Sequence, residues 1–228
     1  MSAIKERPIL FSGPMVRAIL DGRKTVTRRP VKGLQIPKED PAMGETRQRW
    51  SAVGQRDPRY GFCVFGETEQ ACAMELGEFG ACPYGHYGER LWVRETTEID
   101  EQTCDRVALS RYAADQQPVL YSGCENPDYT GSVAHWDYPR RSRPSIHMPR
   151  WSSRLLLEIT SVRVERLQDI SEEQAEAEGV DFLRHAPEAD ETLTAKQLFE
   201  CLWSGINGDA SWKANPWVWV VAFKRIEQ

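Results

Sequence analysis

The segment Trp217–Ile226 has the sequence WVWVVAFKRI and decides the fold. In an extended chain, successive side chains point to opposite faces, so Trp217 and Trp219 lie on one face and Val218 and Val220 on the other. A strand that is apolar on both faces is covered on both faces. We therefore expect this strand at the centre of the core.

A second strand is predicted over Leu155–Leu167. Its apolar residues fall into two groups of opposite phase, Leu155, Leu157 and Ile159, and then Val162 and Val164. A shift of one residue inside a strand indicates a β-bulge, here near Thr160-Ser161. Bulges increase the local twist and help a small sheet to curl into a barrel.

Helix signals follow these strands. Ser171-Glu172-Glu173-Gln174 matches a capping box, in which the Ser171 hydroxyl and the Gln174 side chain satisfy backbone N–H groups of the first turn. This helix is expected to end at Gly179. A further helix is predicted over about 194–206, and an earlier one after Ser12-Gly13-Pro14.

About five or six strands and three helices occur without strict alternation, so a doubly wound sheet is not expected. We predict an α+β fold, with a small mixed or mostly antiparallel β-barrel and helices on its rim. The chain is interpreted as one domain over 1–228, with insertions at about 31–81 and 126–143. Both insertions are rich in Gly, Pro and charge, and we expect the first to be largely loop, with short strands at most.

The composition restricts the class of protein. A net charge of -5 does not suit a general polyanion binder, so any contact with nucleic acid is expected at a local patch. No apolar run has the ~20 residues that cross a bilayer, and Met1–Pro8 lacks the apolar core of a signal peptide. We therefore expect a cytoplasmic protein without a membrane partner, and the sequence leaves its oligomeric state open.

Four stretches, taken in order, resemble the ASCH domain family, which is PUA-like: Gly22–Arg28 (GRKTVTR), Gly88–Val93 (GERLWV), Leu167–Gly179 and Trp217–Ile226. The first matches a signature of a glycine, a lysine, a polar residue three positions later and a basic residue. The order of the four stretches over the whole chain makes the resemblance specific. Cys82–Gly85 and Ser145–Trp151 are similar to long members that phages and prophages often carry.

The resemblance implies a PUA-like β-barrel and a nucleoside or RNA ligand. Small members of the family are amidohydrolases that remove the acetyl group from 4-acetylcytidine. By motif position, Lys24 corresponds to their proton acceptor, Thr27 to their nucleophile and Glu178 to their proton donor. The long insertions depart from these members and could change the substrate. No cofactor and no metal are implied.

This chemistry makes demands on the three side chains. A threonine hydroxyl needs a neighbouring base, and burial can lower the pKa of a lysine until it serves as one. A glutamic acid kept protonated can give a proton to a departing amine. Residues three apart in a regular strand face opposite ways, so Lys24 and Thr27 converge only if the turn after Gly22 is irregular. The alternative is that Lys24, Thr27 and Glu178 are ordinary surface or ion-paired residues.

A basic stretch provides candidate residues for binding nucleic acid. Five arginines and no acidic residue occur between positions 140 and 154, and the candidates there and beside the signature are Arg28, Arg29, Arg141, Arg143, His147, Arg150 and Trp151. Arginines hold phosphates, and a tryptophan stacks on a base. The alternative is a solvated basic loop that pairs with the acidic region 169–191.

The cysteines leave two interpretations open. Cys63, Cys72 and Cys82 lie near His86, with Cys104 and Cys124 further on, and such residues can bind zinc. Structural zinc sites usually contain two cysteines only two to four residues apart, and no such pair occurs here. We expect isolated free thiols, with zinc as the alternative.

Three functions remain possible at this stage. The leading hypothesis is an amidohydrolase that acts on acylated cytidine or a related modified nucleoside. The alternatives are a non-catalytic module that binds RNA or a modified base, and a ribonuclease in which Lys24 stabilises the charged transition state.

Overall fold

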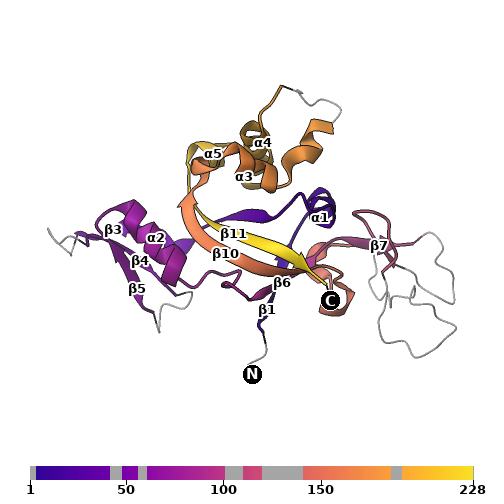
Figure 1. Ribbon diagram of the computed structural model, residues 1–228, viewed down its shortest axis with the longest axis horizontal. Helices are drawn as coiled ribbons and strands as arrows, with labels where there is room; N and C mark the ends of the chain where they lie inside the picture. The colour runs from indigo at the N-terminus through magenta and orange to yellow at the C-terminus, as the bar shows by residue number, and fades with distance from the viewer. Residues whose placement is uncertain are drawn as a thin grey trace.

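A curved five-stranded sheet forms the centre of the molecule (Figure 1). The computed structural model describes residues 4–41, 48–55, 61–100, 110–119, 141–185 and 192–227. The strand order is β1-β6-β10-β11-β2, in which β1 and β6 are parallel and the remaining neighbours are antiparallel. The described elements are β1 (Glu6–Leu10), α1 (Gly13–Leu20), β2 (Val26–Pro30), β3 (Lys38–Glu39), β4 (Trp50–Val53), β5 (Cys63–Gly66), α2 (Glu69–Phe79), β6 (Arg90–Arg94), β7 (Thr97–Ile99), β8 (Ser110–Tyr112), β9 (Ser142–Arg143), β10 (Leu156–Arg166), α3 (Glu172–Ala177), α4 (Ala195–Asn207), α5 (Ala210–Lys213) and β11 (Trp217–Ile226).

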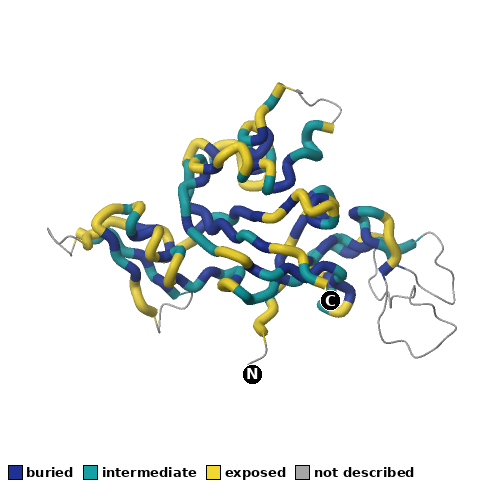
Figure 2. Tube along the Cα trace, viewed as in Figure 1, coloured by how far each residue is buried: buried dark blue, intermediate teal, exposed yellow. Residues whose placement is uncertain are grey.

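The central strand is β11, as its sequence predicts. It pairs with β10 on one side and β2 on the other, and Val218, Val220 and Val221 are fully buried. Its two faces contribute to two different apolar clusters, because Trp219 packs in one and Val218 and Val220 in the other. Figure 2 shows the resulting band of buried chain through the middle of the molecule.

The predicted bulge is confirmed in β10. Ile159 pairs with Phe223, but Ser161 pairs with the adjacent Ala222, so the register shifts by one residue between them. The extra residue bends the strand, and Figure 1 shows β10 and β11 curving together around the side that carries α3 and α4.

The prediction of a closed barrel is not confirmed. Within the described residues the sheet is open, with β1 and β2 at its edges. Helix α1 connects these two edges and buries Met15, Val16 and Ile19 in the same cluster as the sheet. The Arg29 guanidinium also donates to the Leu10 carbonyl at 2.8 Å, so a side chain and a helix span the gap where strand pairing would close a barrel.

Helices α3, α4 and α5 cover one side of β10 and β11 (Figure 1). The predicted capping box at the start of α3 is present, with bonds between Ser171 and Gln174 in both directions. A second capping box joins Thr194 and Gln197 at the start of α4. These helices bury an apolar cluster against the sheet that includes Leu198, Phe199, Trp203, Trp212 and Val220. The mixed α and β composition and the helices beside the sheet agree with the sequence analysis.

The first insertion is more regular than expected. Residues 31–81 include a three-stranded antiparallel sheet, β3-β4-β5, and the 11-residue helix α2, which the sequence analysis did not predict. Helix α2 packs closely on β10, because a Cβ added at Gly77 would lie 2.9 Å from the Val164 nitrogen. The short strands were foreseen, but the expectation of a mainly looped segment was wrong.

The remaining small sheet, β8-β7-β9, lies at the opposite end of the molecule from β3-β4-β5 (Figure 1). Of the second insertion, 126–143, only residues 141–143 are among the described residues. No helix in the described part of the chain is long and apolar enough to cross a membrane.

Candidate functional site

An irregular turn places Lys24 before β2 rather than in it. Gly22 has φ +74°, a left-handed conformation that glycine adopts without strain. The N–H groups of Arg23 and Lys24 both donate to the Ala18 carbonyl, at 2.8 and 3.0 Å, so the chain turns tightly around the end of α1. The turn therefore has the irregularity that convergence of Lys24 and Thr27 requires.

The Lys24 side chain points inward and its ammonium group is fully hydrogen-bonded. Its Nζ donates to Glu178 Oε2 at 2.7 Å and to the carbonyl oxygens of Val26 and Glu178, both at 2.8 Å. The same Nζ lies 5.4 Å from the centre of the Phe11 ring. Three acceptors use all three protons of an ammonium group, so this arrangement fits the charged form of Lys24.

The end of α3 holds Glu178 against this lysine. The Thr25 N–H donates to the Ala177 carbonyl at 2.9 Å, which joins the start of β2 to the helix end. A Cβ at position 179 would lie 3.0 Å from the Lys24 Cβ, so only glycine allows the two segments to approach this closely. Lys24 and Glu178, 154 positions apart in the sequence, are thus brought into direct contact.

Arg28 is a second cation on the same carboxylate. Its Nη1 donates to Glu178 Oε1 at 3.3 Å, and its Nη2 donates to Glu165 Oε1 at 2.6 Å and to the Gln174 side-chain oxygen. The side chain of Arg28 has no exposed surface, and that of Glu178 is 3% exposed. Glu178 is therefore shared by two buried cations, and Arg28 is committed to protein partners instead of to a phosphate.

Burial lowers the pKa of Lys24 from its usual value of 10.5, because an ammonium loses its hydration in the core. The Glu178 carboxylate opposes this shift, because its charge and its hydrogen bond raise the pKa of Lys24. The positive charges of Arg29 and Arg28 lower that pKa further. The balance makes Lys24 easier to deprotonate than a lysine in water.

A small cavity of about 50 Å³ lies beside this ion pair, between β2, α1 and α4. Its described lining includes Thr27, Arg28, Arg29 and Glu178, with apolar side chains of α4 opposite them. Thr27 is 3% exposed, and none of the three Lys24 hydrogen bonds goes to it. The structure therefore brings Thr27 and Glu178 to one cavity, and Lys24 contacts Glu178 but is not among the described lining residues.

Two residues that line this cavity each have a buried hydrogen-bond donor without a partner among the described residues. These donors are Nε of Arg29 and the indole Nε1 of Trp203. A buried donor without an acceptor costs about 1–3 kcal/mol, so such groups often bind a water or a ligand oxygen. Sequence analysis did not single out Trp203, since its position on the apolar face of α4 indicates only a core residue.

The basic stretch does not form one free cationic surface. Arg150 pairs with Glu6 at 2.9 Å, and Arg154 pairs with both Glu95 and Asp115. Arg143 is buried, whereas Arg141, His147 and Trp151 are exposed. Among the described residues, the paired arginines Arg150 and Arg154 use acidic residues of β1, the segment after β6 and the turn after β8, rather than the acidic region that the alternative interpretation favours.

Arg154 is the centre of a half-buried cluster. It makes two bonds of 2.9 Å to Glu95, lies 3.8 Å from the centre of the Tyr112 ring, and bonds Asp115. Burial raises the pKa of Glu95, although Arg154 opposes the shift. This cluster connects the main sheet to the small sheet that contains β7. Arg154 therefore has a structural role.

The cysteines in the described part of the chain are free thiols. Cys72 and Cys82 are buried and Cys63 is exposed, and burial raises the pKa of each buried thiol to about 11. No group of three or more His, Cys, Asp or Glu side chains is placed to hold a metal ion among the residues described. Cys104 and Cys124 lie outside that part of the chain.

Comparison with known proteins gives no family for this chain. No family model, no curated protein and no solved structure matches it.

Proposed function

We propose that this chain is a PUA-like protein of the ASCH type that binds an acylated pyrimidine nucleoside and hydrolyses its exocyclic amide. One observation supports this most strongly. Lys24 and Glu178, the residues that the resemblance implies as base and acid, are in contact at 2.7 Å, and Thr27 shares a cavity with Glu178. The Lys24 amine and the Glu178 carboxyl, 154 positions apart in the sequence, are in direct contact, and Thr27 lines the cavity that Glu178 also lines.

The size of the cavity suggests which part of the substrate enters it. At about 50 Å³ it is far smaller than the roughly 300–1,000 Å³ of pockets that enclose a whole small ligand. One water occupies about 30 Å³ of liquid, so the cavity accepts a few heavy atoms only. An acyl group fits this limit, and the pyrimidine ring stays outside, near Pro30 and Asn207.

The hydrogen bond between Lys24 and Glu178 provides a path for the proton that the reaction needs. Transfer of one proton from Lys24 to Glu178 along their hydrogen bond gives a neutral amine and a neutral acid. Once Lys24 turns toward Thr27, it accepts the hydroxyl proton while the Thr27 oxygen bonds to the acyl carbon. Glu178 then protonates the departing amine nitrogen as the C–N bond breaks, and water releases the acyl group from Thr27.

The two unpartnered donors have a place in this scheme. When oxygen attacks an acyl carbon, negative charge develops on the former carbonyl oxygen, and fixed N–H donors stabilise it. Arg29 and Trp203 both line the cavity, and the unpartnered Arg29 Nε and Trp203 Nε1 are the candidates for this role. Removal of one oxyanion donor typically reduces kcat by about 10²–10³-fold.

The test is release of cytidine from 4-acetylcytidine by the purified protein, measured by liquid chromatography. Thr27→Val keeps the shape of the side chain and removes the nucleophile, so it should abolish release without changing the melting temperature. Thr27→Ser should retain part of the activity. Cys201→Ser, an exposed position on α4, is the matched control and should behave as wild type. Full activity of Thr27→Val would refute the mechanism.

A second candidate function is a binding module without chemistry. The fully hydrogen-bonded ammonium of Lys24 favours it, because no lone pair is available in this arrangement. This candidate predicts saturable binding of a modified nucleoside or RNA, detected by calorimetry, with no product formed. Product release by wild type that Thr27→Val removes would exclude it.

A further inference from the structure

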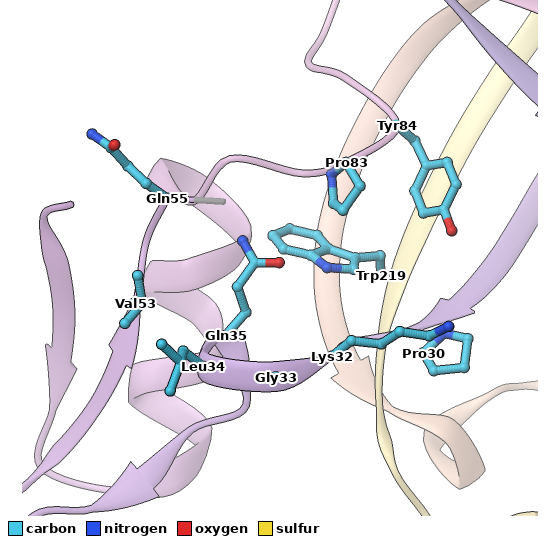
Figure 3. Close-up of a pocket in the computed structure, with 10 residues that line it drawn as sticks. All are labelled: Pro30, Lys32, Gly33, Leu34, Gln35, Val53, Gln55, Pro83, Tyr84 and Trp219. Carbon is cyan, nitrogen blue, oxygen red and sulfur yellow. The ribbon is translucent and has the colours of Figure 1, made fainter. Parts of the chain in front are cut away.

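A larger cavity lies between the main sheet and the inserted sheet β3-β4-β5. Its volume is about 410 Å³, within the usual range of roughly 300–1,000 Å³ for pockets that bind small ligands. Figure 3 shows Trp219 of β11 in the middle of this cavity wall, with Gln35 and Lys32 from the segment after β2, and Pro83 and Tyr84 from the segment after α2. The insertion therefore creates a site that the central sheet alone would not have.

The indole N–H of Trp219 lacks a partner at this wall. Trp219 is 1% exposed, and its Nε1 makes no hydrogen bond to any described residue. Figure 3 shows the nitrogen edge of the ring on the side of Gln35 and Lys32. An unsatisfied buried donor is rare in native proteins, so a ligand acceptor at this edge would remove a real energetic cost.

Gln35 supplies an acceptor in the lining of the same cavity. The Gln35 amide is held by its Nε2, which donates to the Ala81 carbonyl at 3.1 Å. Its Oε1 accepts no hydrogen bond among the described residues, and Figure 3 shows this oxygen directed toward the Trp219 ring. The wall thus offers one donor and one acceptor, with the acceptor fixed in orientation.

The other walls suit a flat ring with a negatively charged substituent. Pro30, Pro83 and the Tyr84 ring supply apolar surface, and none of the described lining residues is acidic. Lys32 is exposed and is the one charged residue in that described lining. A lysine ammonium is a common partner of phosphate, because its charge is compact and its stem is flexible.

We propose that this cavity binds a nucleotide, whose base edge bonds Trp219 Nε1 and Gln35 Oε1 and whose phosphate lies near Lys32. Every nucleobase has an edge that presents both an acceptor and a donor, and these match the donor of Trp219 and the acceptor of Gln35 in the lining. The ring lies against the proline and tyrosine surfaces, and the sugar and phosphate extend toward solvent.

The site is distinct from the small cavity of the proposed reaction. Pro30 lines both, so the two cavities lie on either side of the end of β2. The nucleotide site rests on the donor, the acceptor and the cation described above, and it stands whether or not the protein hydrolyses an amide.

The test is a titration of protein carrying ¹⁵N-labelled tryptophan, followed by NMR of the indole Nε1–H resonances. The chain has eight tryptophans, and Trp219→Phe identifies the relevant signal. UMP, CMP, AMP and GMP are the probes, with the nucleosides and ribose 5-phosphate as controls. We expect the Trp219 signal to shift in a saturable way with at least one nucleotide, less with its nucleoside, and not with ribose 5-phosphate.

Two variants separate the contribution of the phosphate to binding from that of the base. Lys32→Ala, at an exposed position, should weaken nucleotide binding by roughly 3- to 10-fold and leave nucleoside binding unchanged, because it removes one charge-assisted contact. Gln35→Met should weaken nucleotide and nucleoside by a similar factor. Cys201→Ser, at an exposed position on α4 outside both cavities, is the matched control and should bind as wild type does.

The outcomes are decisive in each direction. A Trp219 signal that no nucleotide moves at millimolar concentration overturns the proposal, and an equal shift with ribose 5-phosphate shows an anion site without base recognition and also overturns it. A short oligouridylate that binds more tightly than UMP supports a nucleotide within single-stranded RNA as the ligand. Equal binding supports a free nucleotide.

Discussion

Replacement of Glu178 by glutamine should destabilise the protein more than replacement of Lys24 by methionine. Glu178 serves two buried cations, Lys24 at 2.7 Å and Arg28 at 3.3 Å. In Glu178→Gln the Lys24 ammonium keeps two carbonyl acceptors but no counter-charge, and removal of one partner of a buried ion pair costs about 3–5 kcal/mol. In Lys24→Met the carboxylate still has Arg28, so the cost should be about 1–3 kcal/mol.

The double variant tests whether the two residues act together. Because Lys24→Met/Glu178→Gln contains neither charge, its destabilisation should fall below the sum of the single variants by about 1–3 kcal/mol. The assay is urea unfolding followed by tryptophan fluorescence, with free energies compared at equal slope. Glu158→Gln is the control, since Glu158 pairs at 2.9 Å with the exposed Lys224 and should lose less than about 1 kcal/mol.

The reasoning fails if the order is reversed or if the effects simply add. A Lys24→Met variant less stable than Glu178→Gln would mean that Arg28 does not stabilise the carboxylate. Additive effects would mean that the contact between Lys24 and Glu178 contributes no free energy of unfolding beyond what each residue contributes alone.

Three further predictions follow from the cap, the amine and the thiols. Ser171→Ala should reduce the free energy of unfolding by about 1 kcal/mol, measured in urea, because it removes the N-cap of α3; an unchanged value would mean that the cap is dispensable. Because burial lowers the pKa of Lys24 below 10.5, the unfolded chain binds the Lys24 proton more tightly than the folded protein does. The stability of wild type relative to Lys24→Met should therefore rise with pH between the lowered pKa and 10.5. Urea midpoints of both proteins from pH 7 to about 10 test this, and a difference that does not change with pH would contradict it. Iodoacetamide followed by peptide mapping should label the exposed Cys63 rapidly and the buried Cys72 only after unfolding, and rapid labelling of Cys72 in folded protein would contradict its burial.

The elements that the sequence predicts well are those with strong local patterns. The phase change in 155–167 indicates the bulge between Ile159 and Ser161, and the apolar run WVWVVAFKRI gives β11 its observed limits. Helix α2 lacks such a pattern. Its buried face consists of Cys72, Ala73 and Leu76, with Gly77 against β10, so small residues stand where a typical amphipathic helix has large ones.

Local sequence patterns do not predict whether the sheet closes into a barrel. A bulge predicts curvature, but whether the edge strands meet depends on what lies between them. Here α1 and the Arg29 side chain occupy that gap, and neither the position of α1 nor the bond from Arg29 to Leu10 has a signature in the sequence.

The candidate site was predictable only through the resemblance and the glycines. Gly22 and Gly179 mark the two turns that let Lys24 approach Glu178, and both have positive φ. The second cation on Glu178, Arg28, was expected to face a phosphate, since a sequence shows that a residue is charged but not which partner it meets. The sequence likewise does not show that the indole N–H groups of Trp203 and Trp219 lack partners, because tertiary packing determines which groups form hydrogen bonds.

The position of β11 has a consequence for biosynthesis. This strand is the last of its sheet to leave the ribosome, yet it separates β10 from β2. At about 5–20 residues per second, β2 therefore waits for roughly ten seconds or more before its neighbour exists. Strands β1, β6 and β10 can associate earlier, whereas the Lys24 turn stays without its sheet throughout this interval. Chaperone contact during translation should accordingly concentrate on the segment that contains α1 and β2.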